Sequence, residues 1–414
     1  MSFTPETVRA QFSALHQWHN GLPVTFFDGP GGSQVPLSVL EEMTTYLGHF
    51  NANLGSPYFS SQITTDLTSD ARRACQALLN APSEDSIVFG ANMTTLTFSL
   101  SRAISRTWQE GDEVVVTALD HYANVSSWQQ AAEDKSVAVK QAQVKAEDCS
   151  LDIEHLLSLI TPKTRLVALT LASNASGSIL EITDIAAVVK AAKEVGAQVY
   201  IDAVHYAPHQ LIDVQQLDCD FLVCSAYKFF GPHIGIAYVA PKWIQAIQPY
   251  KVEPAPELGP SRFETGTQSF EALAGLIACI NYLAQWGDTT RSLRQRLEQS
   301  FAVFNLYETL LSDYFLQRLR ELEGVTLWGR ESANSRLRTP TFALTFAQFT
   351  PQEVAMELGA RNLCLGSGHF YALGLVRQLG LEERGGVVRI GLMHYNTKEE
   401  IDRLFDALQE LVNR

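Results

Sequence analysis

The sequence reads Tyr200-Ile-Asp-Ala-Val-His205 and, further on, Ser225-Ala-Tyr-Lys-Phe-Phe-Gly-Pro232, and these two stretches decide the expected fold. Each follows a run of apolar residues typical of a buried strand, over Gln198–Ile201 and Phe221–Cys224. Asp202 ends the first strand, where a carboxylate costs free energy unless it has a partner. Lys228 lies just past the second strand, so we expect both charges at neighbouring strand ends.

The sequence on either side alternates short apolar strands with helices. Near-continuous apolar strands separated by helices indicate a parallel sheet covered on both faces, and ligands of such sheets bind beyond the carboxyl ends of the strands. The other expected strands are Ser86–Phe89, Glu113–Ala118, Leu166–Leu171 and Gly235–Val239, and the expected helices begin near Thr94 and cover Val125–Ala132 and Ile182–Val195.

The pattern changes after about residue 285. A long amphipathic helix over Thr290–Asp313 and a closing helix over Lys398–Val412 flank strands at Thr341–Thr345 and Val387–Leu392. We therefore predict a large domain over 25–285 and a smaller α+β domain over 286–414. An N-terminal helical segment, 1–24, is expected to pack on the small domain, with its helix over 5–19.

Bulk composition narrows the class of protein. The 414 residues are 46% hydrophobic and 18% charged, as in a globular protein, and the net charge of −14 disfavours binding to nucleic acid or anionic lipid. No run approaches the roughly 18 apolar residues that span a bilayer. The six scattered cysteines are typical of reduced, mostly buried thiols, so a cytoplasmic location is expected, without membrane or nucleic-acid partners.

The Asp202–Lys228 arrangement suits pyridoxal 5′-phosphate (PLP). A carboxylate keeps the pyridine nitrogen protonated, so that the ring withdraws electrons, and a lysine forms a Schiff base with the aldehyde. On spacing alone, a structural ion pair between Asp202 and Lys228 at the sheet edge is an equal alternative.

The same residues resemble the class V aminotransferase group of fold-type I PLP enzymes, which contains cysteine desulfurases, selenocysteine lyases, kynureninases and isopenicillin N epimerase-like proteins. The shared pattern is a strand ending in D-x-x-H or D-x-x-Q, then S-x-x-K with G-P shortly after, and the match extends over most of the chain. The resemblance implies a large domain with a mainly parallel seven-stranded sheet between helices and a smaller α+β C-terminal domain.

The resemblance also implies roles for individual residues. Lys228 would form the Schiff base and move protons at the substrate's α-carbon. Asp202 would pair with the pyridine nitrogen, and His205 would hydrogen-bond the phenolate oxygen. Ser225 and Tyr227 match positions that contact the cofactor phosphate.

Two further turns match the group. Gly90-Ala-Asn-Met-Thr-Thr95 joins a strand to a helix, which places free N–H groups and the helix dipole at an anion site; Met93 and Thr94 would bind phosphate through their amides, although an ordinary N-cap explains the turn equally. Asp120-His-Tyr-Ala-Asn124 resembles E-H-x-A-N, so His121 would stack on the pyridine ring. A lone histidine is otherwise more often structural.

The remaining matches concern the substrate and a second subunit. Asn174 matches an asparagine near the cofactor oxygen and the substrate carboxylate. Arg389 matches the arginine that grips the substrate α-carboxylate through two parallel hydrogen bonds, with a surface arginine as the alternative. The Arg262–Thr267 segment resembles R-F-E-x-G-T, whose Gly266 and Thr267 would reach a neighbouring subunit's phosphate, which implies a homodimer with shared sites.

The N-terminal loops supply expected wall residues of the substrate pocket. These are Gly31, Gly32, Asn51, Asn53 and Tyr58.

One loop departs from the desulfurase pattern. Where that subgroup has R-x-G-H-H-C, this chain has Gly366-Ser-Gly-His-Phe-Tyr371. Tyr371 stands at the position of the sulfur-accepting cysteine and cannot form a persulfide. Cys364 is expected to be a structural thiol on the strand before the loop.

We therefore predict a PLP-dependent enzyme acting on a small L-amino acid, cysteine desulfurase-like or selenocysteine lyase-like, of C–S lyase or desulfurase type. A class V aminotransferase or epimerase, or a PLP-binding protein without turnover, is the alternative. A metal hydrolase using Asp202, His205 and His209 is a third reading, but Pro208 interrupts the helix that would align the two histidines.

Overall fold

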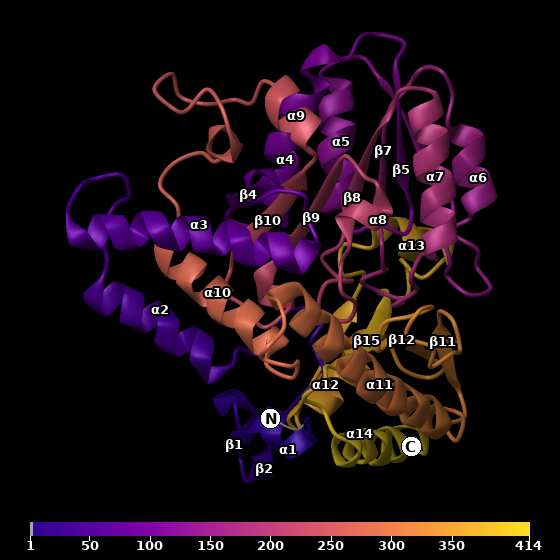
Figure 1. The fold of residues 1–414 in the computed structure, drawn as a ribbon. Helices are drawn as coiled ribbons and strands as arrows, with labels where there is room; N and C mark the ends of the chain where they lie inside the picture. Colours follow the sequence, from indigo (N-terminus) through magenta and orange to yellow (C-terminus); the bar gives the residue numbers. More distant parts are fainter. Residues whose placement is uncertain (1–2) are drawn as a thin grey trace.

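The computed structural model describes residues 3–414, and its centre is a seven-stranded sheet (Figure 1). β10 runs antiparallel to both of its neighbours, β4 and β9, and the remaining neighbours are parallel, which confirms the mainly parallel sheet. In order across the sheet the strands are β4 (Ile87–Gly90), β10 (Gly235–Val239), β9 (Phe221–Ser225), β8 (Gln198–Asp202), β7 (Thr164–Thr170), β5 (Glu113–Thr117) and β6 (Ala138–Ala142).

Both faces of this sheet are buried. Alternate side chains of a strand point to opposite faces, and Val115 and Val167 belong to one buried cluster whereas Val114 and Leu166 belong to another. The near-continuous apolar strands of the sequence follow from this double coverage. The covering helices are α3 (Phe59–Leu79), α4 (Met93–Ile104), α5 (Ala123–Glu133), α6 (Ile153–Leu159), α7 (Ile182–Glu194) and α10 (Phe270–Ala284), and α2 (Leu37–His49) packs against α10.

A second, antiparallel sheet lies in the C-terminal part of the chain. Its order is β11 (Val325–Trp328), β12 (Thr341–Phe346), β15 (Val387–Gly391) and β14 (Gly366–Gly368). A separate buried cluster packs this sheet against α11 (Leu293–Leu319), α12 (Pro351–Gly359) and α14 (Lys398–Val412). α14 has the expected bounds, whereas α11 continues past the expected end at Asp313 because its later turns bury Phe315 and Leu316 in this cluster.

The N-terminal segment is less helical than predicted. α1 covers only Pro5–Arg9, and a 3-10 turn follows at Ser13–His16, so the expectation of one helix over 5–19 is wrong. The helix ends where it does because the next residues direct Phe12 inward, against Phe230, Tyr282 and Tyr395.

The same segment also contacts the C-terminal part. Arg9 forms an ion pair with Glu400 at 2.8 Å, and β3 (Thr25–Phe26) pairs with β13 (Leu363–Cys364). The short elements that complete the chain are β1 (Trp18–His19), β2 (Leu22–Pro23), α8 (Val214–Leu217), α9 (Pro241–Ala246) and α13 (Leu373–Gln378). No helix within residues 3–414 is both long and apolar enough to cross a membrane.

Candidate active site at the carboxyl edge of the large sheet

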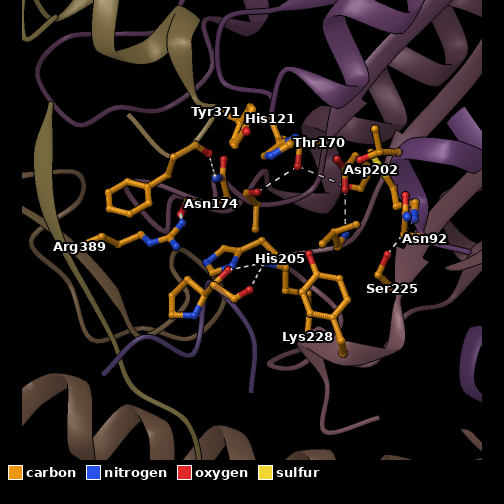
Figure 2. A pocket seen from close by; sticks show the side chains of 18 of the residues that line it. Asn92, His121, Thr170, Asn174, Asp202, His205, Ser225, Lys228, Tyr371 and Arg389 are labelled. Carbon is orange, nitrogen blue, oxygen red and sulfur yellow. Dashed lines mark hydrogen bonds between the residues drawn. The ribbon is translucent and has the colours of Figure 1, made fainter. Parts of the chain in front are cut away.

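A cavity of about 500 Å³ lies beyond the carboxyl ends of β8 and β9, where Figure 2 shows charged and polar side chains converging. This volume is typical of a small-ligand site. Most of the residues singled out from the sequence line it: Met93, Thr94, His121, Asn174, Asp202, His205, Ser225, Tyr227, Lys228 and Arg389. They come from six separate stretches of sequence, and the fold brings these stretches together at one cavity.

Lys228 lies in the turn that follows β9, as predicted. Its Nζ donates hydrogen bonds to the carbonyl oxygens of Pro30 (2.6 Å) and Gly31 (2.9 Å), and lies 4.8 Å from the ring centroid of Tyr227. Burial lowers the pKa of Lys228 to about 7, and the positive charge of Arg389 acts in the same direction. An amine with this pKa is partly neutral near physiological pH, and a neutral amine is a nucleophile.

Asp202 is the last residue of β8 and is almost fully buried. One carboxylate oxygen accepts a hydrogen bond from the Val204 amide at 2.8 Å. Burial raises the pKa of Asp202 to about 7. Asp202 and Lys228 form no direct ion pair within the described chain, so the alternative of a structural pair at the sheet edge receives no support.

The amino end of α4 points into the cavity. Its first amide, Met93, donates to Ser225 Oγ at 2.9 Å, and the Asn92 side chain caps the amide of Thr95 at 2.9 Å. The Thr94 amide has no protein acceptor among the described residues. The turn is therefore both an ordinary N-cap and a free N–H at a helix terminus, which is a favourable place for an anion.

His121 is held as a neutral ring by its surroundings. Its Nδ1 accepts a hydrogen bond from the Ala123 amide at 3.1 Å, and burial lowers its pKa to about 4, with Lys228 and Arg389 acting in the same direction. Asp120 beside it is fully buried and accepts from Asn124 Nδ2 at 2.7 Å, which fixes the turn. Sequence reasoning gave Asp120 no role, although its place directly after a strand was a signal.

Arg389 of β15 reaches the cavity from the C-terminal sheet. Its Nη1 donates to the Asn174 carbonyl at 2.8 Å, and its guanidinium lies 3.8 Å from the ring centroid of Phe370. Burial lowers its pKa to about 9, so it still carries its charge at neutral pH. The alternative of a surface arginine is wrong, because the side chain is buried and lines the cavity.

Asn174 is held by the same loop. Its Nδ2 donates to the Phe370 carbonyl at 2.8 Å, whereas its Oδ1 is buried and has no hydrogen-bond partner in the described chain. A buried acceptor without a partner is unusual in a folded protein. Asn174 Oδ1 is therefore free to accept from a ligand in the cavity.

The rim of the cavity is the turn after β14. Phe370 (φ 50°) and Tyr371 (φ 59°) are both left-handed, a conformation that non-glycine residues adopt at a cost and that is often found at functional sites. The Tyr122 amide donates to the Tyr371 carbonyl at 2.8 Å, and the Tyr371 ring lies 5.2 Å from the His121 ring. The side chain of Tyr371 remains 65% exposed, so it forms the boundary between the cavity and solvent.

His205 lines the cavity but does not belong to a metal site. Its Nε2 bonds Thr339 Oγ1 at 3.0 Å, and His209 Nδ1 bonds Glu308 at 2.9 Å. Among residues 3–414, no group of three or more His, Cys, Asp or Glu side chains is placed to hold a metal ion. The metal-hydrolase reading receives no support from this arrangement.

Several predicted residues lie outside the cavity lining. Gly31 lines the cavity, whereas Gly32 packs below it, where an added Cβ would lie 3.3 Å from the Tyr227 ring. Gly266 and Thr267 are exposed. Asn51, Asn53 and Tyr58 are also exposed and do not line the cavity, and Cys364 is only partly buried, in β13.

The structure adds residues that sequence reasoning missed. Thr170, at the carboxyl end of β7, lines the cavity and donates to the Asp202 carbonyl at 3.2 Å. His233 stacks on Tyr227 with the ring centroids 5.0 Å apart. Asp28 is largely enclosed, and burial raises its pKa against the opposing charges of Arg389 and Lys228. The strand-end position of Thr170 was a usable signal, whereas His233 and Asp28 are placed only by tertiary structure.

Comparisons with known proteins show similarity over nearly the whole chain. A model of the family described as "Aminotransferase class-V" matches residues 25–404. A cysteine desulfurase of Pectobacterium carotovorum is 31% identical over 99% of this chain and 98% of its own length. The aminotransferase-like protein FGM3 of Gibberella zeae is 34% identical over the same shares of the two chains. The solved cysteine desulfurase of Thermococcus onnurineus superposes with a TM-score of 0.88 at 25% identity, covering 100% of both chains.

Proposed function

The chain belongs to the class V aminotransferase family of PLP-dependent enzymes, and from this we propose that it cleaves the carbon–sulfur bond of a small L-amino acid. The observation that supports the proposal most is the cavity in which Lys228, Asp202 and Arg389 lie together. Lysine and carboxylate suit the cofactor, and the arginine suits the substrate. We favour a C–S lyase over a persulfide-forming desulfurase because of Tyr371 at the rim of the cavity.

The residues of the cavity fit PLP. The Thr94 amide and the amino end of α4 suit a phosphate, and Ser225 lies beside them, bonded to the Met93 amide. The buried, unpartnered Asn174 Oδ1 can accept from a hydroxyl or ammonium group. When bound, PLP supplies an electron-withdrawing ring that stabilises negative charge at the substrate's α-carbon.

Lys228 would hold the cofactor covalently and then act as the base. Its depressed pKa of about 7 leaves a large neutral fraction at physiological pH, which favours attack on a carbonyl carbon. The same Nζ can take the proton from the substrate's α-carbon and return it, because an amine with a pKa near the working pH suits both directions.

Asp202, His121 and His205 would fix the ring and its charge. In the protein without cofactor, burial raises the pKa of Asp202 to about 7. Its carboxyl group can therefore share a proton with a ring nitrogen near neutral pH. His121 has a flat neutral face on the cavity, which suits stacking. His205 follows β8 in the sequence, and its Nε2 is hydrogen-bonded to Thr339.

Arg389 would bind the substrate α-carboxylate. Among residues 3–414, only one of its N–H groups donates a hydrogen bond, to the Asn174 carbonyl. The rest of the fork is free to grip a carboxylate through two parallel bonds. Phe370 covers the other side of the guanidinium and restricts it to this orientation.

Tyr371 is the reason for preferring a lyase. No cysteine lines the cavity within the described chain, and the rim position that contains the sulfur acceptor in the resembling desulfurases is a tyrosine. Sulfur would therefore leave as sulfide through the open mouth. Elimination balances without an oxidant: cysteine and water give pyruvate, ammonia and sulfide.

A second candidate is transamination. The 34% identity to an aminotransferase-like protein favours it, as does the absence of a cavity thiol. Both reactions begin with loss of the same α-proton, so the protein groups named above serve either one. Epimerisation, or binding of PLP without turnover, would be distinguished by the same experiment.

The test is a panel of L-amino acids, including cysteine and selenocysteine, read by absorbance of the bound cofactor and by product analysis. Sulfide with pyruvate is the expected result. Alanine with sulfur bound to the protein would indicate a desulfurase, and a keto acid with the amino group retained on the cofactor would indicate transamination. No spectral change with any amino acid would contradict the proposed enzyme activity.

We also propose a homodimer with shared sites. Gly266 and Thr267 are exposed and do not line the cavity of their own chain, so they are free to reach the phosphate site of a second copy. Light scattering on the purified protein tests the dimer. The division into a segment at 1–24, a large domain at 25–285 and a small domain at 286–414 is likewise proposed, and the cytoplasmic location stays a prediction.

A further inference from the structure

A buried carboxylate on α11 has no part in the chemistry described above. Glu308 is 3% exposed, and its Oε2 accepts a hydrogen bond from Nδ1 of His209, which is 1% exposed, at 2.9 Å. Its other oxygen, Oε1, is buried without a hydrogen-bond partner in the described chain. Burying a carboxylate and an imidazole costs desolvation free energy. Removing one partner of such a pair destabilises the protein more than replacing both by apolar residues, because it leaves a buried polar group unpaired.

The His209–Glu308 pair is separated from the cavity by the ring of His205. The His209 ring packs against the His205 ring in a T-shaped arrangement, with the centroids 5.7 Å apart and the planes at 72°. His205 lines the cavity, and its Nε2 is held by Thr339. Glu308 thus connects to the cofactor pocket through two contacts, although it belongs to the helix that packs the C-terminal sheet.

We propose that Glu308 is a positioning residue that acts through His209 to fix the orientation of His205, the imidazole that lines the cavity. The inference rests on the proposed function, which assigns PLP to this cavity. A carboxylate can only accept a hydrogen bond, so Glu308 makes Nδ1 of His209 the donor and selects one tautomer. The His209 ring cannot then turn without leaving Glu308 unpaired.

The charges around the pair support this reading. Burial lowers the pKa of His205 well below its ordinary value, and positive charge on His209, Arg389 and Lys228 lowers it further. Burial raises the pKa of Glu308, and the hydrogen bond from His209 opposes that rise. His205 therefore stays neutral, and the pair controls its orientation.

One further titratable group faces the pair from the opposite side. His394 donates its backbone N–H toward Glu308, and its ring Nε2 bonds the Tyr282 hydroxyl at 2.7 Å. Burial lowers the pKa of His394 to about 3, and burial raises that of Tyr282, so both stay neutral. His209 is the group in this cluster whose ring hydrogen-bonds the Glu308 carboxylate.

The test compares Glu308→Gln with Asn305→Ala. Glu308→Gln keeps the shape but removes the charge, and its amide can donate as well as accept, so the tautomer of His209 is no longer imposed. Asn305 lies one turn earlier on α11 and accepts a hydrogen bond from Gln210, the residue after His209, without any charge. Asn305→Ala therefore loosens the same contact between α11 and the 205–210 turn while leaving the Glu308–His209 pair intact.

The readout is the apparent pKa of the pH-dependent visible band of bound PLP. Once the orientation of His205 beside the cofactor is no longer fixed, this pKa should shift by about half a unit or more in Glu308→Gln and in His209→Gln. Asn305→Ala should leave it unchanged. The double variant Glu308→Gln/His209→Gln should shift no further than either single variant, because the two residues act as one unit. It buries no unpaired charge, so it serves where a single variant fails to fold.

A second readout needs no cofactor. In PLP-free protein, the pH dependence of Lys228 labelling by acetic anhydride, read by mass spectrometry, should shift in the same direction. Wild-type protein that never binds PLP would overturn the proposed function, whereas this labelling would still test the pair. Wild-type pH profiles in both charge-removing variants, an equal shift in Asn305→Ala, or additive shifts in the double variant would overturn the positioning role.

Discussion

The floor and the rim of the cavity are built by different parts of the molecule. The floor comes from strand ends of the large sheet and holds Lys228 and Asp202. The rim comes from the turn after β14, next to the C-terminal sheet, and presents the exposed ring of Tyr371. The two regions belong to different sheets with separate buried clusters.

Under the proposed function, holding the cofactor and choosing the product are separate tasks in this molecule. A side chain at the end of a packed strand is fixed by the sheet, so the groups that hold the cofactor tolerate little change. A turn tolerates a new side chain more readily because it lies at the surface. Changes to the floor should therefore abolish the reaction, whereas changes to the rim should alter its outcome or its speed.

The largest expected effect is on the floor, at Lys228. Lys228→Ala should lower kcat by about 10³-fold or more, because it removes both the covalent attachment and the base. Single-turnover kinetics with cysteine, and gel filtration to measure PLP retention, check this. Lys251, which lies in the 248–260 loop and forms an ion pair with Glu257, offers a matched control, since Lys251→Ala should leave both properties unchanged.

Asp202→Asn should come next. The amide cannot share a proton with a ring nitrogen as a carboxylate can, so kcat should fall by about 10²-fold while PLP is still bound. Steady-state kinetics of the PLP-saturated variant measure this. Wild-type kcat in this variant would mean that Asp202 does not face the pyridine nitrogen.

Arg389→Lys should raise KM for the amino acid by roughly 10-fold or more, with a smaller change in kcat. Lysine keeps the charge but loses the two parallel bonds, each of which contributes about 1.5–3 kcal/mol when charged groups take part. Substrate titrations check the ratio. An unchanged KM would remove Arg389 from the carboxylate site and weaken the account of the floor.

The pH dependence of cofactor uptake sharpens the same comparison. The Lys228 amine is reactive when neutral, and its pKa of about 7 means that the neutral fraction rises as pH rises through 7. The rate of PLP incorporation into cofactor-free protein should therefore increase about tenfold between pH 6 and pH 8. Stopped-flow absorbance measures it. A rate that keeps rising with the same slope up to pH 10 would indicate an ordinary, unshifted lysine.

The smallest effect is expected at the rim. Tyr371→Phe keeps the ring beside His121, 5.2 Å away, and removes only an exposed hydroxyl. PLP affinity should change by less than about threefold, as for a surface change away from a buried network. Equilibrium titration with PLP checks this. A large loss of affinity would mean that the rim also holds the cofactor, and the division between the two regions would fail.

The local sequence pattern was enough to predict the residues at the floor of the cavity. The strand over Phe221–Cys224 and the position of Lys228 after it follow from apolar runs and from the class V motif, and both are found. The reversed direction of β10 was not predictable, because an apolar strand looks the same in either direction. The early end of α1 was missed since Phe12 is drawn inward by residues from distant parts of the chain.

Residues placed by tertiary structure could not be found from pattern. His233 lines the cavity, and Asp28 lies close enough to Arg389 and Lys228 to interact with their charges, only because distant parts of the chain fold together. Glu308 looks like an ordinary polar residue of an amphipathic helix, and only the packing of α11 against the 205–210 turn buries it. A single chain also gives Gly266 and Thr267 no ligand, because their expected partner is a second subunit.

The most direct test of the central claim is borohydride reduction of the yellow, PLP-loaded protein followed by peptide mass mapping. The account predicts one pyridoxyl group per chain, fixed on the peptide that contains Lys228. A pyridoxyl group on any other lysine, or a protein that stays colourless and unlabelled after incubation with PLP, would contradict it.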